Sequence, residues 1–169
     1  MALSAEDRAR KIKIIIFDVD GVLTDGSIWI IPAPVATASG IESKMVEAKG
    51  FNAHDGAGIS LARLGGLKCG IITKRISETV AMRARDLKLE YVYQGQAFKM
   101  KPIREIVQQE GVTLDEICYV GDDVIDLPVM RQCGLAVAVA DARNGVKAEA
   151  HYVTPSRGGR GAARDAIEF

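Results

Sequence analysis

Two clusters of carboxylates are the residues of this sequence with the clearest chemical potential. Asp18 and Asp20 stand two residues apart, directly after the apolar run Ile12–Phe17. A second cluster, Gly121-Asp122-Asp123-Val-Ile-Asp126, follows the apolar run Ile117–Val120 in the same way. Acidic groups that converge without a partner repel one another, whereas a divalent cation relieves that repulsion, and oxygen ligands suit Mg²⁺. A solvated turn or an acidic helix N-terminus explains either cluster alone but not the pair, so the pattern predicts a magnesium site.

Two further residues indicate that this site serves a phosphoryl group. Thr73 ends the apolar segment Gly70-Ile-Ile-Thr, where its hydroxyl and the amides that follow can hold phosphoryl oxygens. Lys99 begins a predicted helix and supplies a fixed positive charge. Each residue alone is usually structural. Together with the acids they compensate the charge of a phosphate and stabilise a metaphosphate-like transition state.

The elements that must position these residues alternate along the chain as in an α/β fold. Segments typical of buried strands are Ile12–Phe17, Lys68–Thr73, Tyr91–Tyr93, Ile117–Val120 and Leu135–Val139. Segments with the length and composition of helices are Gly56–Leu64, Ser77–Leu87, Lys99–Glu110 and Val124–Gln132. This alternation predicts a parallel sheet covered on both faces, with all strand C-termini at one edge, where ligands bind in such sheets.

Two stretches depart from this alternation. Residues 26–52 predict an inserted β-hairpin whose tip, Pro32–Gly40, is unusually long. Residues 155–169, which begin Pro-Ser-Arg-Gly-Gly-Arg, predict a flexible, basic C-terminal tail. The sequence contains no internal repeat, and its 169 residues are expected to form a single domain.

Composition limits the partners and the compartment. Lys plus Arg and Asp plus Glu both number 22, so no general attraction to nucleic acid or to an anionic membrane is expected. The longest apolar runs fall far short of the roughly 20 residues that span a bilayer, and the N-terminal segment lacks the features of a secretory signal. Three cysteines, Cys69, Cys118 and Cys133, lack metal-site spacing. We expect reduced core cysteines in a cytoplasmic protein.

The order of the motifs resembles that of haloacid dehalogenase superfamily phosphatases. The shared elements are Asp-x-Asp-Gly-x-x-Thr-Asp-Gly from Asp18, a strand-terminal Thr73, Lys99, and Gly-Asp-Asp-x-x-Asp from Gly121. This resemblance implies a Rossmann-like three-layer α/β fold with the hairpin in place of a cap domain, and Mg²⁺ as cofactor. It also implies that Asp18 is the nucleophile that forms an aspartyl-phosphate and that Asp20 is the general acid and base.

The same resemblance implies roles for the remaining candidates. The metal ligands would be Asp18, the main-chain carbonyl of Asp20, and Asp122, supported by Asp123 and Asp126 through water or from behind. The phosphoryl group and the rest of the substrate would be bound by Thr73, Lys74, Arg75, Lys99, Arg157 and Arg160. Lys74 stands where the family usually has Gly.

Further segments resemble the branch of this family that acts on phosphates of keto-deoxy sugar acids. They are Asp55-Gly-Ala-Gly-Ile, Tyr93-Gln-Gly, Val137-Ala-Val-Ala-Asp-Ala, His151-Tyr-Val-Thr and Gly158-Gly-Arg-Gly. The resemblance implies 3-deoxy-D-manno-octulosonate 8-phosphate as the substrate and a lipopolysaccharide core sugar as the product. It also implies a homotetramer in which a neighbouring subunit covers each pocket and the tail reaches a site. Lys74 and the long hairpin tip leave the exact sugar acid open.

Three alternatives remain open. A nine-carbon sugar acid phosphate would suit the same scaffold. A signalling receiver domain also combines acids, Mg²⁺, Thr and Lys, but its phosphorylated Asp ends the third strand, and no Asp ends Tyr91–Tyr93. An interaction protein that has lost its activity is disfavoured because the acids of both clusters are intact.

Overall fold

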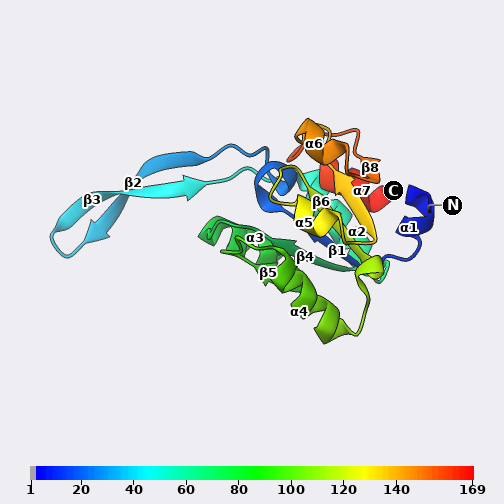
Figure 1. Ribbon diagram of the computed structural model, residues 1–169. Coiled ribbons are helices and arrows are strands. Elements are labelled where there is room, and N and C mark those ends of the chain that lie inside the picture. The colour runs from blue at the N-terminus through cyan, green and yellow to red at the C-terminus, as the bar shows by residue number, and fades with distance from the viewer. Residues whose placement is uncertain (1–2) are drawn as a thin grey trace.

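A parallel sheet forms the centre of the computed structural model, which describes residues 3–169 (Figure 1). Its strand order is β5-β4-β1-β6-β7-β8. The strands are β1 (Ile14–Phe17), β4 (Lys68–Ile72), β5 (Tyr91–Tyr93), β6 (Ile117–Gly121), β7 (Leu135–Ala138) and β8 (Tyr152–Val153). β1 is central, and its last residue, Phe17, pairs with Ile71 of β4 and Val120 of β6. The segments that leave β1, β4 and β6 therefore begin side by side at one edge.

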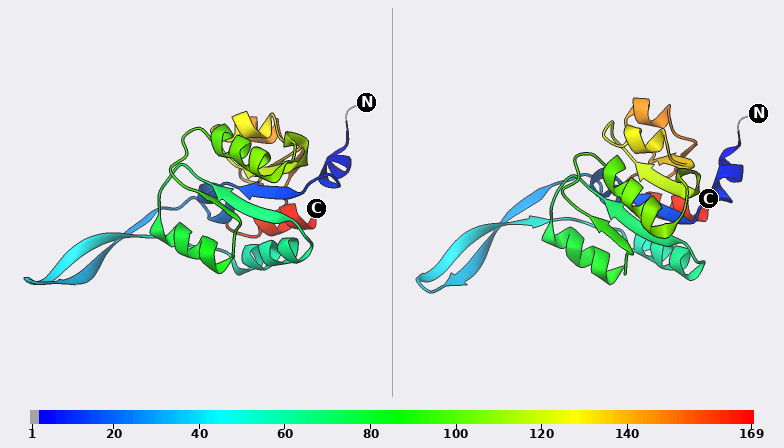
Figure 2. Two further views of the ribbon diagram at one scale, coloured as in Figure 1. Left: turned by 90° about the horizontal axis from the view of Figure 1, so that it is seen from below. Right: turned by 60° about the horizontal axis from the view of Figure 1, so that its bottom comes forward.

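Helices cover both faces of the sheet, as Figure 2 shows. One face carries α2 (Ala53–Leu64), α3 (Glu78–Asp86) and α7 (Ala162–Glu168), and the other carries α4 (Met100–Glu110) and α5 (Leu127–Met130). Two further short helices, α1 (Ala5–Ala9) and α6 (Asn144–Lys147), pack near β7. Because both faces are covered, all four residues of β1 are buried and apolar. The predicted α/β fold is confirmed, although the sequence did not predict β8, α1, α6 or α7.

A β-hairpin projects from the body at the edge where β1 ends (Figure 1). It consists of β2 (Trp29–Thr37) and β3 (Gly40–Ala48). The predicted long tip is wrong, because Pro32 and Pro34 lie within β2, opposite Met45 and Ser43. The two prolines are two residues apart and so share one edge of the strand, where a two-stranded ribbon needs no main-chain donor.

The expected flexible tail is also wrong, because the C-terminal segment is folded against the body. Ala162, Ala163 and Ala166 of α7 are buried. The buried carboxylate of Asp55 accepts hydrogen bonds from the main-chain nitrogens of Gly161, at 3.3 Å, and Arg164, at 3.0 Å.

The glycines before α7 allow this segment to pack closely against the backbone of the loop after β1. Gly159 N donates a hydrogen bond to Val22 O at 2.8 Å, which binds this turn to the loop after β1. A side chain at Gly158 would overlap the carbonyl oxygen of Gly21. Only glycine lets two backbones meet this closely.

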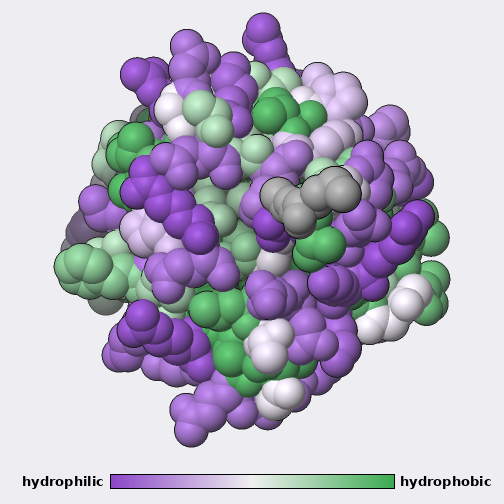
Figure 3. All heavy atoms as spheres, turned by 45° about the vertical axis from the view of Figure 1, so that its right-hand side comes forward, coloured by the Kyte–Doolittle hydropathy of each residue, from purple (hydrophilic) through white to green (hydrophobic). Residues whose placement is uncertain are grey.

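One face of the molecule is largely polar, in agreement with the composition, and the cysteines lie in the core, as the sequence predicted. The face shown in Figure 3 is largely hydrophilic, with smaller hydrophobic patches between the polar groups. Cys69, Cys118 and Cys133 are buried and unpaired, as expected for core residues. Among residues 3–169, no helix has both the length and the apolar character needed to cross a membrane.

Candidate active site

The predicted site residues meet at the carboxyl edge of three adjacent strands. Asp18 follows β1, Asp122 follows β6 and Thr73 follows β4. They line a cavity of about 190 Å³ together with the neighbouring residues Asp20, Lys74, Arg75, Asp123 and Ile125. Three segments separated by about fifty residues each in sequence thus supply one cavity.

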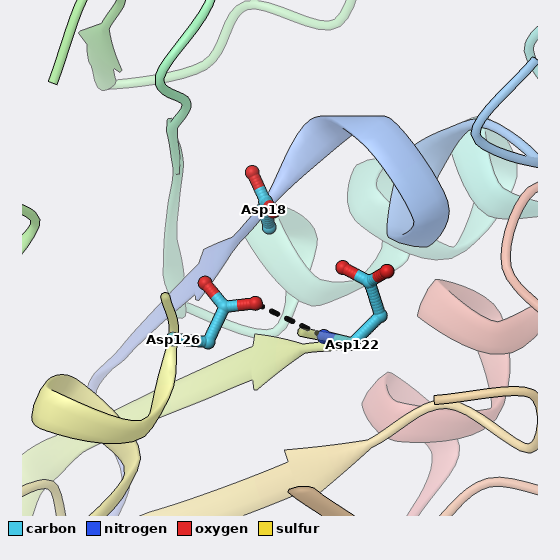
Figure 4. Close-up of side chains that lie close together, drawn as sticks. All are labelled: Asp18, Asp122 and Asp126. Carbon is cyan, nitrogen blue, oxygen red and sulfur yellow. Dashed lines mark hydrogen bonds between the residues drawn. The ribbon is translucent and has the colours of Figure 1, made fainter. Parts of the chain in front are cut away.

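Three carboxylates lie close enough to share a cation. One oxygen each of Asp18, Asp122 and Asp126 lies within 4.8 Å of the others. Figure 4 shows Asp18 coming from the end of β1, and Asp122 and Asp126 coming from the segment between β6 and α5. The loop after β1 turns at Gly21, whose φ of 95° is a backbone conformation that favours glycine. A side chain at Gly21 would overlap the Asp122 carboxylate, so glycine lets the loop after β1 close over the acids.

Asp126 orients this cluster from behind. Its Oδ1 accepts hydrogen bonds from Lys99 Nζ and Tyr119 Oη, each at 2.7 Å. Its Oδ2 accepts from the main-chain nitrogens of Asp122 at 3.0 Å and Asp123 at 3.2 Å. Both oxygens are therefore occupied, and Asp126 fixes the β6–α5 loop and the lysine rather than offering a free ligand.

Asp18 and Asp122 are weaker acids than ordinary aspartates. Burial raises the pKa of Asp18 to about 6 despite the opposing effect of Lys99. Burial together with the charges of Asp18 and Asp126 raises the pKa of Asp122 to about 8. Asp122 Oδ1 is buried and has no hydrogen-bond partner among the described residues. An orphaned buried oxygen beside a second carboxylate is the donor set that a hard divalent cation requires, so these residues fit Mg²⁺.

Lys99 neutralises part of the cluster. Its ammonium lies 2.9 Å from Asp18 Oδ1 and 2.7 Å from Asp126 Oδ1, and its side chain is 1% exposed. Burial alone would lower the pKa of Lys99, but the two carboxylates outweigh burial and raise it. The residue is therefore a fixed cation beside Asp18.

Asp20 enters an ion-pair network that the sequence did not predict. Lys49, just beyond β3, pairs with Asp20 Oδ1, and Arg75 Nε lies 3.8 Å from Asp20 Oδ2. Glu47 of β3 joins both cations, at 3.7 Å from Lys49 and 2.5 Å from Arg75. Glu47 and Lys49 belong to no recognisable sequence motif, so the sequence offered no reason to place them at the site.

Of the remaining candidates, some line the cavity and others do not. Thr73 is buried, and its hydroxyl accepts a hydrogen bond from Arg75 N at 3.4 Å. Lys74 is exposed at the cavity wall, and its φ is negative, so the backbone there does not require the usual glycine. Arg157 and Arg160 of the same chain do not line the cavity, and Arg160 faces Asp25 at 3.5 Å.

Comparison with known proteins gives a consistent match. Residues 71–164 match a family model described as haloacid dehalogenase-like hydrolase. The chain is 39% identical to 3-deoxy-D-manno-octulosonate 8-phosphate phosphatase KdsC of Yersinia pestis, over 96% of this chain and 81% of that protein.

Solved structures match as well. One is the Moraxella catarrhalis 3-deoxy-D-manno-octulosonate 8-phosphate phosphatase in complex with magnesium, phosphate and KDO (TM-score 0.85, 32% identity, 97% of this chain and 88% of that chain). Another is the cobalt-bound phosphatase of Haemophilus influenzae (TM-score 0.82, 33% identity, 95% and 88%).

Proposed function

Because the chain belongs to the haloacid dehalogenase-like hydrolases, we propose that it is a Mg²⁺-dependent phosphatase that hydrolyses 3-deoxy-D-manno-octulosonate 8-phosphate. The observation that carries this proposal is the convergence of Asp18 and Asp122 at one cavity, with Lys99 2.9 Å from Asp18 and with no hydrogen-bond partner for Asp122 Oδ1 among residues 3–169. That arrangement binds a cation and leaves a carboxylate facing the space where a phosphoryl group can lie. The product would be a sugar acid of the lipopolysaccharide core.

The first step transfers the phosphoryl group to Asp18. A carboxylate oxygen of Asp18 bonds to phosphorus while the bond from phosphorus to the sugar oxygen breaks. Asp20 gives a proton to the departing alkoxide, which leaves as a neutral hydroxyl. Lys99 and the Thr73 hydroxyl stabilise the charge on the phosphoryl oxygens. Mg²⁺ would be held by Asp18, Asp122 and the main-chain carbonyl of Asp20, and it would supply further positive charge there.

The second step regenerates the enzyme. Asp20 takes a proton from a water molecule whose oxygen attacks phosphorus, and the bond between phosphorus and Asp18 breaks. Inorganic phosphate leaves and Asp18 is again a carboxylate. Two easier displacements thus replace one difficult displacement.

Substrate selection needs more than this cavity supplies. Its volume of about 190 Å³ is below the roughly 300–1,000 Å³ of typical ligand pockets, so it suits a phosphoryl group better than a whole sugar acid. Lys74 and Arg75 lie at its wall, and from there they would meet the sugar acid. Arg157 and Arg160 of a neighbouring subunit would complete the site, since those of the same chain do not line the cavity.

The hairpin supports a homotetramer of single-domain subunits. It exposes large apolar side chains, among them Trp29 at 61% and Ile41 at 80%, and patches of this kind mark protein interfaces. Packing of hairpins from several copies would bury these side chains and place one subunit over the next subunit's cavity. We assign the enzyme to the cytoplasm, where sugar acid precursors are made.

A nine-carbon sugar acid phosphate is the alternative substrate. The test is Mg²⁺-dependent phosphate release, measured with eight- and nine-carbon sugar acid phosphates and with p-nitrophenyl phosphate. We expect the highest kcat/KM with the eight-carbon compound and no turnover by Asp18→Asn, because an amide cannot form the acyl phosphate. Asp20→Asn should be phosphorylated slowly at best and should not hydrolyse the intermediate. Equal, wild-type-like rates for both variants would contradict the proposed function.

A further inference from the structure

Lys49 has an environment that is unusual for a lysine at the base of a hairpin. It lies one residue beyond β3, yet its side chain has 0% exposure. Its ammonium pairs with Asp20 Oδ1 and lies 3.7 Å from Glu47 Oε1. A lysine loses solvation when it is buried, so it is retained there only when its charge is paired.

Lys49 pairs with Asp20, the proposed general acid and base. Asp20 lines the cavity beside Asp18, and its side chain is 22% exposed. An aspartate at such a rim can turn toward solvent, since only two side-chain torsions hold it. Lys49 holds one carboxylate oxygen from the hairpin side, and Arg75 approaches the other at 3.8 Å.

Glu47 fixes both cations in turn. The Glu47 carboxylate contacts Arg75 Nη2 at 2.5 Å. The main-chain carbonyl oxygen of Glu47 accepts a hydrogen bond from Thr79 Oγ1 at 3.3 Å. The base of the hairpin is therefore tied to the loop after β4 as well as to the loop after β1. Through these contacts the position of the hairpin sets the position of Lys49.

We propose that Lys49 is a positioning residue that holds the Asp20 carboxylate in the orientation required for proton transfer. This inference rests on the proposed function, in which Asp20 is the acid and base. It assigns the hairpin base to the catalytic apparatus of its own subunit, in addition to any contact that the hairpin makes with other copies.

The expected effect follows from the geometry. Misplacement of a catalytic group by about 1 Å can cost about 100-fold in rate. Replacing Lys49 by Met keeps the length and the burial of the side chain but removes the charge that Asp20 contacts. We expect kcat on the sugar acid phosphate to fall about 10- to 100-fold, while KM changes less than about 3-fold, because the variant alters no group that binds substrate.

The choice of leaving group separates positioning from a general structural defect. An alkoxide needs a proton from Asp20 to leave, whereas p-nitrophenolate leaves as a stable anion. The kcat/KM for p-nitrophenyl phosphate reports only the steps through phosphoryl transfer to Asp18. It should therefore change less than about 3-fold in Lys49→Met, while kcat/KM for the alkyl phosphate falls with kcat.

The experiment compares Lys49→Met with the control Lys44→Met, an exposed lysine on the same hairpin. Both are assayed with Mg²⁺ on 3-deoxy-D-manno-octulosonate 8-phosphate and on p-nitrophenyl phosphate, and both are melted thermally. Lys49→Gln replaces the methionine variant if the latter fails to fold. Lys44→Met should match the wild type on both substrates.

Three results would overturn the inference. They are an equal loss of kcat/KM on both substrates, a raised KM with unchanged kcat, and wild-type kinetics. In an Asp20→Asn background the Lys49 substitution should cause no additional loss, since it acts through Asp20. A wild-type enzyme that released phosphate from neither compound would refute the proposed function instead, so the two failures are distinguishable.

Discussion

Replacing Asp122 by Asn should stabilise the metal-free protein and abolish its stabilisation by Mg²⁺. The side chain of Asp122 is half-buried, faces Asp18 and Asp126, and has an oxygen that finds no hydrogen-bond partner in the described part of the chain. Asparagine keeps the shape of the side chain and removes the charge. It therefore relieves repulsion in the metal-free protein and removes a ligand from the metal-bound one.

The magnitude follows from the pKa of Asp122, which burial and the neighbouring carboxylates raise from 3.8 to about 8. A carboxyl group with a raised pKa binds its proton more tightly in the folded state, so stability falls as the pH rises from about 4 toward 8. Each pH unit corresponds to about 1.4 kcal/mol, which bounds the penalty at neutral pH at about 4 kcal/mol. Coupling among the three acids reduces this figure, and we expect the variant to gain about 2 kcal/mol.

The assay is thermal unfolding in EDTA and in excess Mg²⁺, at pH 7.5 and at pH 4. For a protein of this size about 2 kcal/mol corresponds to roughly 4–8 °C in Tm. The variant should melt higher than the wild type in EDTA at pH 7.5 and lose that advantage at pH 4, where the carboxyl is protonated. Asp86→Asn is the control, because Asp86 is exposed at the end of α3 and lies outside both the cluster and the cavity. A variant that melts lower in EDTA would show that Asp122 is not repelled by its neighbours, and one that Mg²⁺ still stabilises would show that Asp122 is not a metal ligand.

Two other predictions concern the tail and the hairpin. Gly158→Ala should lower the free energy of unfolding by about 1–3 kcal/mol in urea denaturation, because the new methyl group would overlap the Gly21 carbonyl. Gly145→Ala meets nothing within 4 Å and should not destabilise; similar results for the two variants would contradict this packing. Ile41→Glu should reduce the mass of the assembly measured by light scattering, whereas Leu64→Glu, 85% exposed on α2, should not. An unchanged mass for Ile41→Glu would argue against assembly through the hairpin.

The sequence predicted the parts of the site that strand ends position. Asp18, Thr73 and Asp122 each follow a buried apolar strand, and parallel strands must bring their carboxyl ends to one edge. The order of the strands then decides which residues meet. Because β1 lies between β4 and β6, all three residues reach one cavity.

Long-range contacts explain what the sequence did not predict. The Lys49–Asp20 pair joins residues 29 positions apart, and it depends on how the hairpin returns to the body, which no local pattern encodes. The glycines of the tail were interpreted as signs of flexibility, since glycine is enriched in mobile segments. At Gly158 the same residue type permits backbone contact, and only the fold distinguishes the two uses.

Trapping the covalent intermediate is the decisive test of Asp18 as the nucleophile. Wild-type protein mixed with Mg²⁺ and 3-deoxy-D-manno-octulosonate 8-phosphate, quenched in acid within one turnover and mapped by peptide mass spectrometry, should carry one phosphoryl group on Asp18. Turnover of the substrate with that carboxylate unmodified, or with the phosphoryl group on another residue, would rule out Asp18 as the nucleophile.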